Sequence, residues 1–417
     1  MNTFYSFTFG CRVNEAEKVA LDKQLQDLGF IWTEHNPDFY IINSCAVTGK
    51  AEREVRQHIY QIKKKFPKSK IIVTGCAATN WIKNDVHVTG IDYTIENEKK
   101  MDIPMFLQKL DINNKYHIRS HMRKNVVKEK TPNQRVTVTT RYTDKFLHSG
   151  RCMVKIQDGC DRFCSYCIVP YLRGKPKSRT IEEIITHINS YIEPNNPRSN
   201  RGSKISNLDS PLRGNDKGEG GNTIKLTCIS EIILTAINTE CFGKDTGETL
   251  IQLIDAILKQ TTIPKISFGS IHPWSITDEF LDYYQSIIQT NRFIPFFHIP
   301  VQSGSNKILK LMNRGYKAEE MLKKFRKIKS IHSRAFIGTD IIVGFPGETN
   351  KEFQETYKFL TSVPIDKIHV FRFSPRPNTA AEKLIKTYGE PTPEEKRERS
   401  NILINLNGIN NSLKITT

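Results

Sequence analysis

The chain has 417 residues, which is enough for two or three domains with a large core. No apolar run approaches the roughly 20 residues that span a bilayer, and residues 1–5 lack a basic-then-apolar signal pattern, so we expect a cytoplasmic protein with no membrane partner. The net charge of +18 favours a polyanionic partner, with nucleic acid as the leading candidate over a merely cationic surface.

Three strand-and-helix units are expected in the first hundred residues. Strands are predicted at residues 4–9, 38–42 and 70–74, and helices at residues 15–28 and 51–65. Alternation of this kind predicts an open parallel sheet with covering helices.

A cysteine follows each of these three strands: Cys11, Cys45 and Cys76. Because the carboxyl ends of parallel strands share one edge of the sheet, we expect the three thiols to meet in a single site. The alternative is that they are small buried residues that end strands without binding anything.

A basic, aromatic-poor segment follows at residues 115–141. Such a charge run is typical of a solvated connector, and its position between two domains also allows contacts with phosphate groups.

Three further cysteines, Cys160, Cys164 and Cys167, fall within eight residues just after the apolar run 153–156. No second Cys or His pair follows at the spacing of a zinc site. Three thiolates can instead hold three irons of a cubane iron–sulfur cluster and leave the fourth iron open to a substrate. The alternative is a structural metal site.

Residues 194–222 are rich in Asn, Gly, Ser and charge, and we expect a disordered surface loop there. Strand and helix signals then alternate again. With the strand before Cys160 they give about six βα units and predict a partial (β/α) barrel whose active site lies at the carboxyl ends of the strands. The expected strands are 231–235, 265–268, 296–301, 336–343 and 367–373, and the expected helices are 181–192, 250–258, 278–289, 307–312, 318–331 and 351–360.

These patterns divide the chain into an N-terminal domain at 1–114, a basic linker at 115–145, a barrel at 146–390 that contains the insertion, and a charged helix with a short tail at 391–417.

The motif Cys160-x3-Cys164-x2-Cys167, with Tyr166 before the last cysteine, resembles that of the radical S-adenosylmethionine (SAM) superfamily. The motifs around Cys11, Cys45 and Cys76 resemble those of the methylthiotransferase N-terminal domain. The resemblance implies two [4Fe-4S] clusters and SAM as cofactors. It assigns Cys160, Cys164 and Cys167 to a radical-generating cluster and the other three cysteines to an auxiliary cluster that carries the sulfur.

The resemblance continues through the loops that follow the barrel strands. It implies cofactor contacts for Gln302, Ser303, Gly344 and Gly347, while Ala236 stands where the family has a glycine. The two glycines permit close backbone approach to a nucleoside, and Gln302 and Ser303 offer hydrogen bonds. No acid or base catalyst is assigned.

Residues 45–53 are most similar to the branch of the family that modifies threonylcarbamoyladenosine in tRNA. The resemblance thus implies transfer of a methylthio group to the second ring carbon of that adenine beside the anticodon, with tRNA, an external electron donor and a sulfur source as partners. The alternatives are a methylthiotransferase acting on another tRNA adenosine or on a ribosomal protein, and an inactive RNA-binding relative.

Family members normally continue into a small RNA-binding β-barrel, whereas residues 407–417 are all that follow the charged helix here. We therefore expect that module to be absent and the basic surface of the first two domains to contact RNA.

Overall fold

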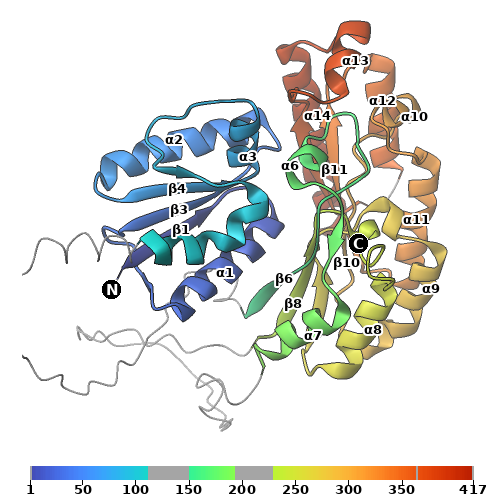
Figure 1. Ribbon diagram of the computed structural model, residues 1–417. Helices are drawn as coiled ribbons and strands as arrows, with labels where there is room; N and C mark the ends of the chain where they lie inside the picture. Colours follow the sequence, from blue (N-terminus) through green and yellow to red (C-terminus); the bar gives the residue numbers. More distant parts are fainter. Residues whose placement is uncertain (1, 111–149, 193–228, 363–364, 416–417) are drawn as a thin grey trace, which may run out of the picture.

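The computed structural model describes residues 2–110, 150–192, 229–362 and 365–415, which form two α/β units side by side (Figure 1). The predicted linker at 115–145 and the predicted insertion at 194–222 lie outside the described residues.

The N-terminal unit is a parallel sheet in the order β2-β1-β3-β4-β5. Its central strand is buried on both faces: Tyr40 and Ile42 pack toward one layer of helices and Ile41 toward the other. The open parallel sheet predicted from the sequence is confirmed, and the short edge strands β2 and β5 are additions to it. The elements are β1 (Thr3–Thr8), α1 (Arg12–Asp27), β2 (Ile31–Trp32), β3 (Phe39–Ser44), α2 (Gly49–Lys65), β4 (Lys70–Gly75), α3 (Cys76–Lys83), β5 (Tyr93–Thr94) and η1 (Asn97–Asp102).

The second unit contains the predicted parallel strands of a partial barrel. The described strands form two sheets, ordered β7-β6-β8-β9 and β10-β11-β12, and a parallel bridge between Ile266 and Phe293 brings the two together. A short antiparallel edge strand, β7, was not predicted. The strands are β6 (Arg151–Asp158), β7 (Lys177–Ser178), β8 (Glu231–Ala236), β9 (Lys265–Phe268), β10 (Phe296–His298), β11 (Phe336–Val343) and β12 (Lys367–Arg372).

Helices cover the outside of this barrel, and capping boxes fix where several of them begin. In α7, for example, Thr180 accepts a hydrogen bond from the backbone of Glu183, whose carboxylate accepts one in return. The helices are α6 (Val169–Arg173), α7 (Ile181–Asn189), α8 (Leu250–Gln260), α9 (Asp278–Ile287), α10 (Asn306–Leu311), α11 (Ala318–Ile331), α12 (Asn350–Thr361), α13 (Ala381–Tyr388) and α14 (Pro393–Ile415), with short 3-10 turns η2 (Thr239–Cys241), η3 (Pro273–Ser275) and η4 (Ile288–Thr290).

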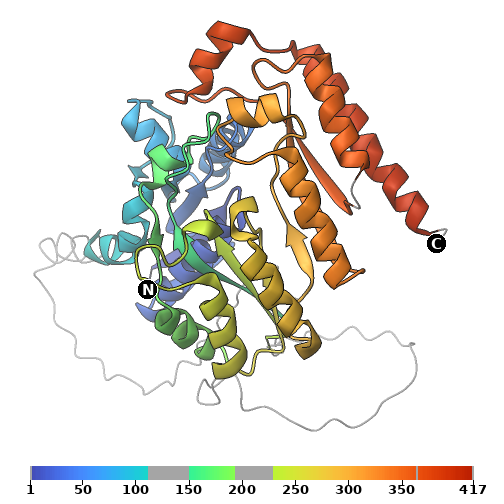
Figure 2. The same cartoon turned by 90° about the vertical axis from the view of Figure 1, so that its right-hand side faces the viewer.

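The last helix, α14, packs along β12 at the edge of the barrel (Figure 2). Leu403 and Leu406 are buried in the main core. The side chain of Asn407 accepts a hydrogen bond from the backbone N–H of Ile368 at 2.7 Å and donates one to its carbonyl oxygen at 2.9 Å. One amide side chain thus satisfies backbone groups on the open edge of β12.

Alternation along β6 explains how the two units meet. Cys152, Val154 and Ile156 point toward the main core of the barrel. Met153, between them, points the other way and packs with Ile233 and with Ala16 of α1. Helix α1 therefore packs against the opposite face of β6 and β8. In the part of the chain that the structure describes, no helix is both long and apolar enough to cross a membrane.

Replacing Leu403 by alanine should lower the free energy of unfolding by about 2–5 kcal/mol, because it leaves a cavity between α14 and β12. The matched control is Ile404→Ala, which changes the next residue of α14, a side chain that is 50% exposed. It should change the same quantity by no more than about 0.5 kcal/mol. Urea denaturation of both variants is the measurement, and equal losses would contradict this packing.

Candidate active site

Cys11, Cys45 and Cys76 lie at the carboxyl edge of the N-terminal sheet, after β1, β3 and β4. Their thiols lie within electrostatic range of one another. Gly10 adopts a φ of +92°, and a Cβ atom on it would lie 2.6 Å from the Sγ atom of Cys45. The structure therefore brings the three predicted ligands together, and a side chain at position 10 would collide with one of them.

Polar side chains from the same motifs hold these loops in place. Asn14 donates to the carbonyl oxygens of Phe9 at 2.8 Å and Ser44 at 3.2 Å, and Asn43 donates to the carbonyl oxygen of Asn14 at 3.1 Å. The hydroxyl of Ser44 accepts a hydrogen bond from the backbone of Ala78 at 3.1 Å, which fixes the start of α3 beside Cys76. The motifs of Cys11 and Cys45 thus each supply both a thiol and a side chain that orients a neighbouring loop.

The second set, Cys160, Cys164 and Cys167, lies in the loop after β6. The backbone N–H of Cys167 donates to the carbonyl oxygen of Cys164 at 2.8 Å, and Phe163 has a φ of +44°, so the loop curls around the thiols. The N–H of Cys160 donates to the carbonyl oxygen of Gly174 at 3.1 Å, which ties the start of the loop to the end of α6.

The donor atoms of both sets suit iron–sulfur clusters. Burial raises the pKa of Cys45 and of Cys167 to about 12, so these thiols need a bound cation to become thiolates. Within residues 2–110, 150–192, 229–362 and 365–415, no three His, Cys, Asp or Glu side chains could hold one metal ion together. A cubane cluster has no such requirement, because each thiolate binds a different iron.

Two buried arginines contact the two cysteine sets. Nε of Arg173 donates to the Sγ atom of Cys76 at 3.3 Å, and Nη1 of Arg314 donates to the Sγ atom of Cys164 at 3.4 Å. Neither arginine was predicted as a site residue. Arg173 was indistinguishable by type from the other arginines of a basic sequence, whereas Arg314 lies in 312–316, one of the loops through which the family resemblance continues.

A buried ion network surrounds Arg173. Glu17 of α1 contacts Lys100 at 2.5 Å, Lys155 at 2.9 Å and Arg173 at 3.0 Å. Burial alone would raise the pKa of Glu17, but the charges of these three cations hold that pKa well below its ordinary value. Since Glu17 and Lys100 belong to the first unit and Lys155 and Arg173 to the second, this network joins the two units at the cysteine sites.

The structure also places the four residues predicted to contact the cofactor. Gln302 has a φ of +77°, and its backbone pairs with Asp340 and Ile342 of β11. The hydroxyl of Ser303 is buried and lies 3.1 Å from that of Thr356, so it already has a partner inside the protein.

The backbone conformation and the close packing at Gly344 and Gly347 explain why both residues are glycines. Gly344 and Gly347 have φ values of +75° and +81°. A Cβ atom on Gly344 would lie 2.3 Å from Cγ of Lys396, and one on Gly347 would lie 3.1 Å from Leu311. The backbone and its neighbours thus require glycine at both positions, and cofactor contact there stays a prediction.

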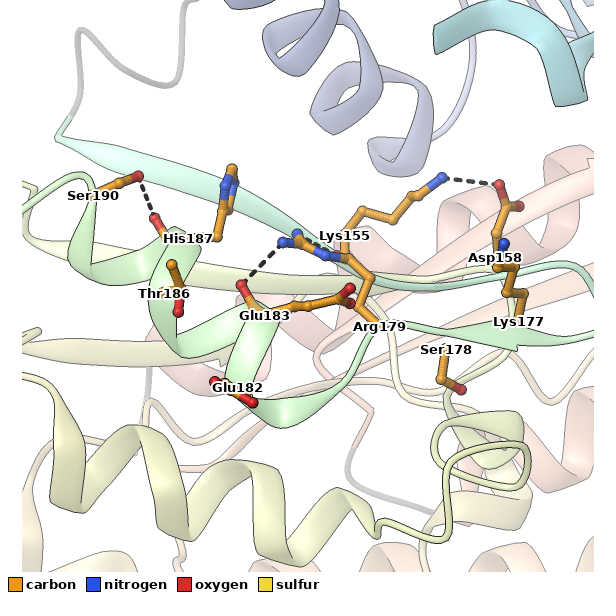
Figure 3. Close-up of a pocket in the computed structure, with 10 residues that line it drawn as sticks. All are labelled: Lys155, Asp158, Lys177, Ser178, Arg179, Glu182, Glu183, Thr186, His187 and Ser190. Carbon is orange, nitrogen blue, oxygen red and sulfur yellow. Dashed lines mark hydrogen bonds and ion pairs between the residues drawn. The ribbon is translucent and has the colours of Figure 1, made fainter.

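A cavity of about 770 Å³ is lined by residues of β6, β7 and α7 and of the segments next to them (Figure 3). Lys155 and Asp158 are on its rim, and their side chains point toward one another and form an ion pair at 2.9 Å. None of the cysteines or predicted cofactor residues lines this cavity. It is therefore separate from the cysteine sites, although it shares these two residues with the network behind them.

Comparisons with known proteins agree with these motifs. Residues 3–89 match the family described as "Uncharacterized protein family UPF0004", and residues 242–360 match the radical SAM superfamily. A threonylcarbamoyladenosine tRNA methylthiotransferase of Aquifex aeolicus is 32% identical, over 95% of this chain and 85% of that protein. One from Thermotoga maritima is 31% identical, over 97% and 81%. A tRNA-2-methylthio-N(6)-dimethylallyladenosine synthase of Clostridium botulinum is also 31% identical, over 96% and 80%.

Solved structures show the same fold at low identity. The radical SAM methyltransferase TsrM of Kitasatospora setae, with cobalamin and a [4Fe-4S] cluster bound, has a TM-score of 0.56 at 12% identity, over 91% of this chain and 74% of that one. The cobalamin-dependent radical SAM enzyme OxsB has a TM-score of 0.51 at 14% identity, over 95% and 56%. These likenesses concern the fold alone.

Replacing Gly10 by alanine should remove one cluster, because the new methyl group collides with Cys45. Reconstituted anaerobically, the variant should bind about four irons per chain where the unaltered protein binds about eight. Gly29→Ala is the matched control, since Gly29 has a similar φ of +86° but no atom within 4 Å of the added methyl group. It should keep all the iron, and full iron binding by the Gly10 variant would contradict the auxiliary site.

Replacing Glu17 by glutamine should lower the free energy of unfolding of the cluster-free protein by about 3–5 kcal/mol at neutral pH, because it leaves buried cations unpaired. A carboxylate with a depressed pKa stabilises the fold above its ordinary pKa, and this contribution is lost as the pH falls through the lower value in the folded state. The difference in the free energy of unfolding between the unaltered protein and the Glu17→Gln variant should therefore be constant above about pH 5. It should shrink as the pH falls further.

Urea denaturation at a series of pH values is the measurement. The matched control is Asp27→Asn, which breaks an exposed ion pair with Lys23 on the same helix. Its effect should stay within about 0.5 kcal/mol. A difference for the Glu17 variant that grows toward acid pH would contradict the assigned direction of the pKa shift.

Proposed function

This chain belongs to the radical SAM methylthiotransferase family, and we propose that it methylthiolates threonylcarbamoyladenosine next to the anticodon of tRNA. At the coarser level it is a radical SAM tRNA methylthiotransferase that uses SAM and [4Fe-4S] clusters. The observation that carries the proposal is the presence of two three-cysteine sets, one from each unit, on either side of the end of α6: Arg173 contacts Cys76, and the carbonyl oxygen of Gly174 accepts a hydrogen bond from Cys160. One site can activate carbon while the other delivers sulfur.

The residues of the chain have distinct parts in this chemistry. We propose that Cys160, Cys164 and Cys167 hold the radical-generating cluster and that Cys11, Cys45 and Cys76 hold the auxiliary cluster. When bound, the first group with SAM supplies the means to activate a C–H bond, and the second supplies the sulfur. Arg173 and Arg314 place positive charge against the thiolates. The buried sulfur atoms of Cys45 and Cys76 are sheltered from water and from oxidation.

The choice of threonylcarbamoyladenosine rests on the stretch 45–53, which lies between the two units. The N–H of Gly49 donates to Ser374 at 3.2 Å, and Glu52 forms a buried ion pair with Arg376 at 2.6 Å. Within this stretch Val47 is exposed. Residues of this stretch thus lie at the contact between the two units.

We further propose that exposed cations of α2 contact the tRNA backbone. Lys50, Arg53 and Arg56 are exposed on this helix, and Arg56 also lies over the ring of Trp81. Exposed arginines beside aromatic rings suit phosphate contact and base stacking in an RNA loop. An external electron donor and sulfur source complete the proposed partners, because the reaction consumes an electron and a sulfur atom. The location that we propose is the cytoplasm, where tRNA is found.

The test is mass spectrometry of tRNA nucleosides from a bacterial strain that lacks its own methylthiotransferases. Expression of this chain should restore the methylthio form of threonylcarbamoyladenosine, whereas Cys160→Ala or Cys76→Ala should not. Cys152→Ala is the matched control, since Cys152 is buried in the barrel core outside both sets, and it should restore the modification. Restoration of methylthio-dimethylallyladenosine alone would refute the proposed base and assign the other branch.

A further inference from the structure

The buried arginines Arg173 and Arg314 have different electrostatic surroundings, but each leaves a positive charge unmatched. They are only 5% and 4% exposed, and each donates a hydrogen bond to a cysteine sulfur. Burying a guanidinium away from water is costly unless an anion or several acceptors face it. The groups around each arginine therefore indicate whether its positive charge is already balanced by a carboxylate or requires another anion.

Arg314 has neutral partners in the described structure. Its guanidinium donates to the carbonyl oxygen of Pro300 at 2.7 Å and to the hydroxyl of Tyr316 at 2.8 Å, and it lies 4.4 Å from the ring centre of Trp274. Among the described residues, no carboxylate forms an ion pair with it, and Cys164 is the one thiol that it contacts, beside the hydroxyls of Tyr166 and Tyr316. The positive charge of Arg314 is therefore buried away from water and lies against the Sγ atom of Cys164.

Arg173 lies in a network where cations outnumber carboxylates. Its guanidinium contacts Glu17 at 3.0 Å and Asp158 at 2.8 Å, and Lys100 and Lys155 share these two carboxylates. Three cations face two carboxylates, so one positive charge is left over near Cys76. This extra positive charge would be balanced by a thiolate at Cys76, as that of Arg314 would be by a thiolate at Cys164.

We propose that Arg173 and Arg314 each raise the reduction potential of one cluster, Arg173 that of the auxiliary cluster and Arg314 that of the radical cluster. The proposal rests on the cluster assignment under the proposed function, but not on the identity of the RNA base. Hydrogen bonds to the sulfur ligands and local positive charge stabilise the reduced cluster, which carries one more negative charge. Because the two arginines contact different cysteine sets, the protein sets the two potentials with separate residues.

The experiment uses the full-length chain in two backgrounds that each keep one cluster. Replacing Cys160, Cys164 and Cys167 by alanine leaves the auxiliary site, and replacing Cys11, Cys45 and Cys76 leaves the radical site. Each background is reconstituted anaerobically, its iron is counted, and the midpoint potential is measured by a dithionite titration followed by electron paramagnetic resonance. Neither tRNA nor SAM is added.

The expected result is a crossed pattern. Arg173→Gln should lower the midpoint potential in the auxiliary background and leave it unchanged in the radical background, and Arg314→Gln should do the reverse. Lysine at either position keeps the positive charge but loses the planar guanidinium. It should therefore shift the midpoint potential less than glutamine does. A purely structural arginine would change iron content or stability without this crossed pattern.

Three results would overturn the proposal. One is an unchanged midpoint potential in an arginine variant that keeps about four irons. Another is an equal shift of both clusters by one arginine. The third is a background that binds no iron, which would refute the cluster assignment, whereas failure of the tRNA assay alone would leave this inference standing. If Arg173→Gln does not fold, Arg173→Lys takes its place, and it should lower the midpoint potential of the auxiliary cluster by less, while leaving that of the radical cluster unchanged.

Discussion

The ion pair between Glu17 and Arg173 is the contact on which the arrangement of the two cysteine sets depends. Glu17 comes from α1, which packs against β6 and β8, and Arg173 ends α6, which follows the loop of Cys160, Cys164 and Cys167. The same guanidinium also contacts Cys76. One buried side chain therefore ties the helix that follows the second set to Glu17 and Cys76 of the first unit. The N-terminal sheet cannot shift along the barrel without leaving a charge unpaired.

The sequence was sufficient to predict features that follow from local periodicity. Apolar strands, the cysteines that follow them and the helix signals lead to an open parallel sheet and a partial barrel. The shared edge of the open sheet brings Cys11, Cys45 and Cys76 together. Arg173 and Arg314 could not be found in this way. An arginine is normally a surface residue, and these two are buried only because partners far away in the sequence surround them.

The cofactor loops show another limit. Cofactor contacts of Ser303 and the two glycines were implied by the family resemblance and suit their residue types. Neither the resemblance nor the type says which way a side chain points or why a glycine is needed. In the structure Ser303 turns toward Thr356, and Gly344 makes room for Lys396 of the last helix. The short strands β2, β5 and β7 were missed because two residues are too few to show a period.

The sequence separation of the central ion pair has a consequence for biogenesis. Glu17 and Arg173 are 156 residues apart, so their contact closes a very long loop and should form late. The N-terminal sheet leaves the ribosome first, with Glu17 and Lys100 present and Arg173 not yet made. The pocket of Cys11, Cys45 and Cys76 is thus unfinished during synthesis. The contact between Arg173 and Cys76 is therefore added to this pocket only after α6 has been made and has docked against α3.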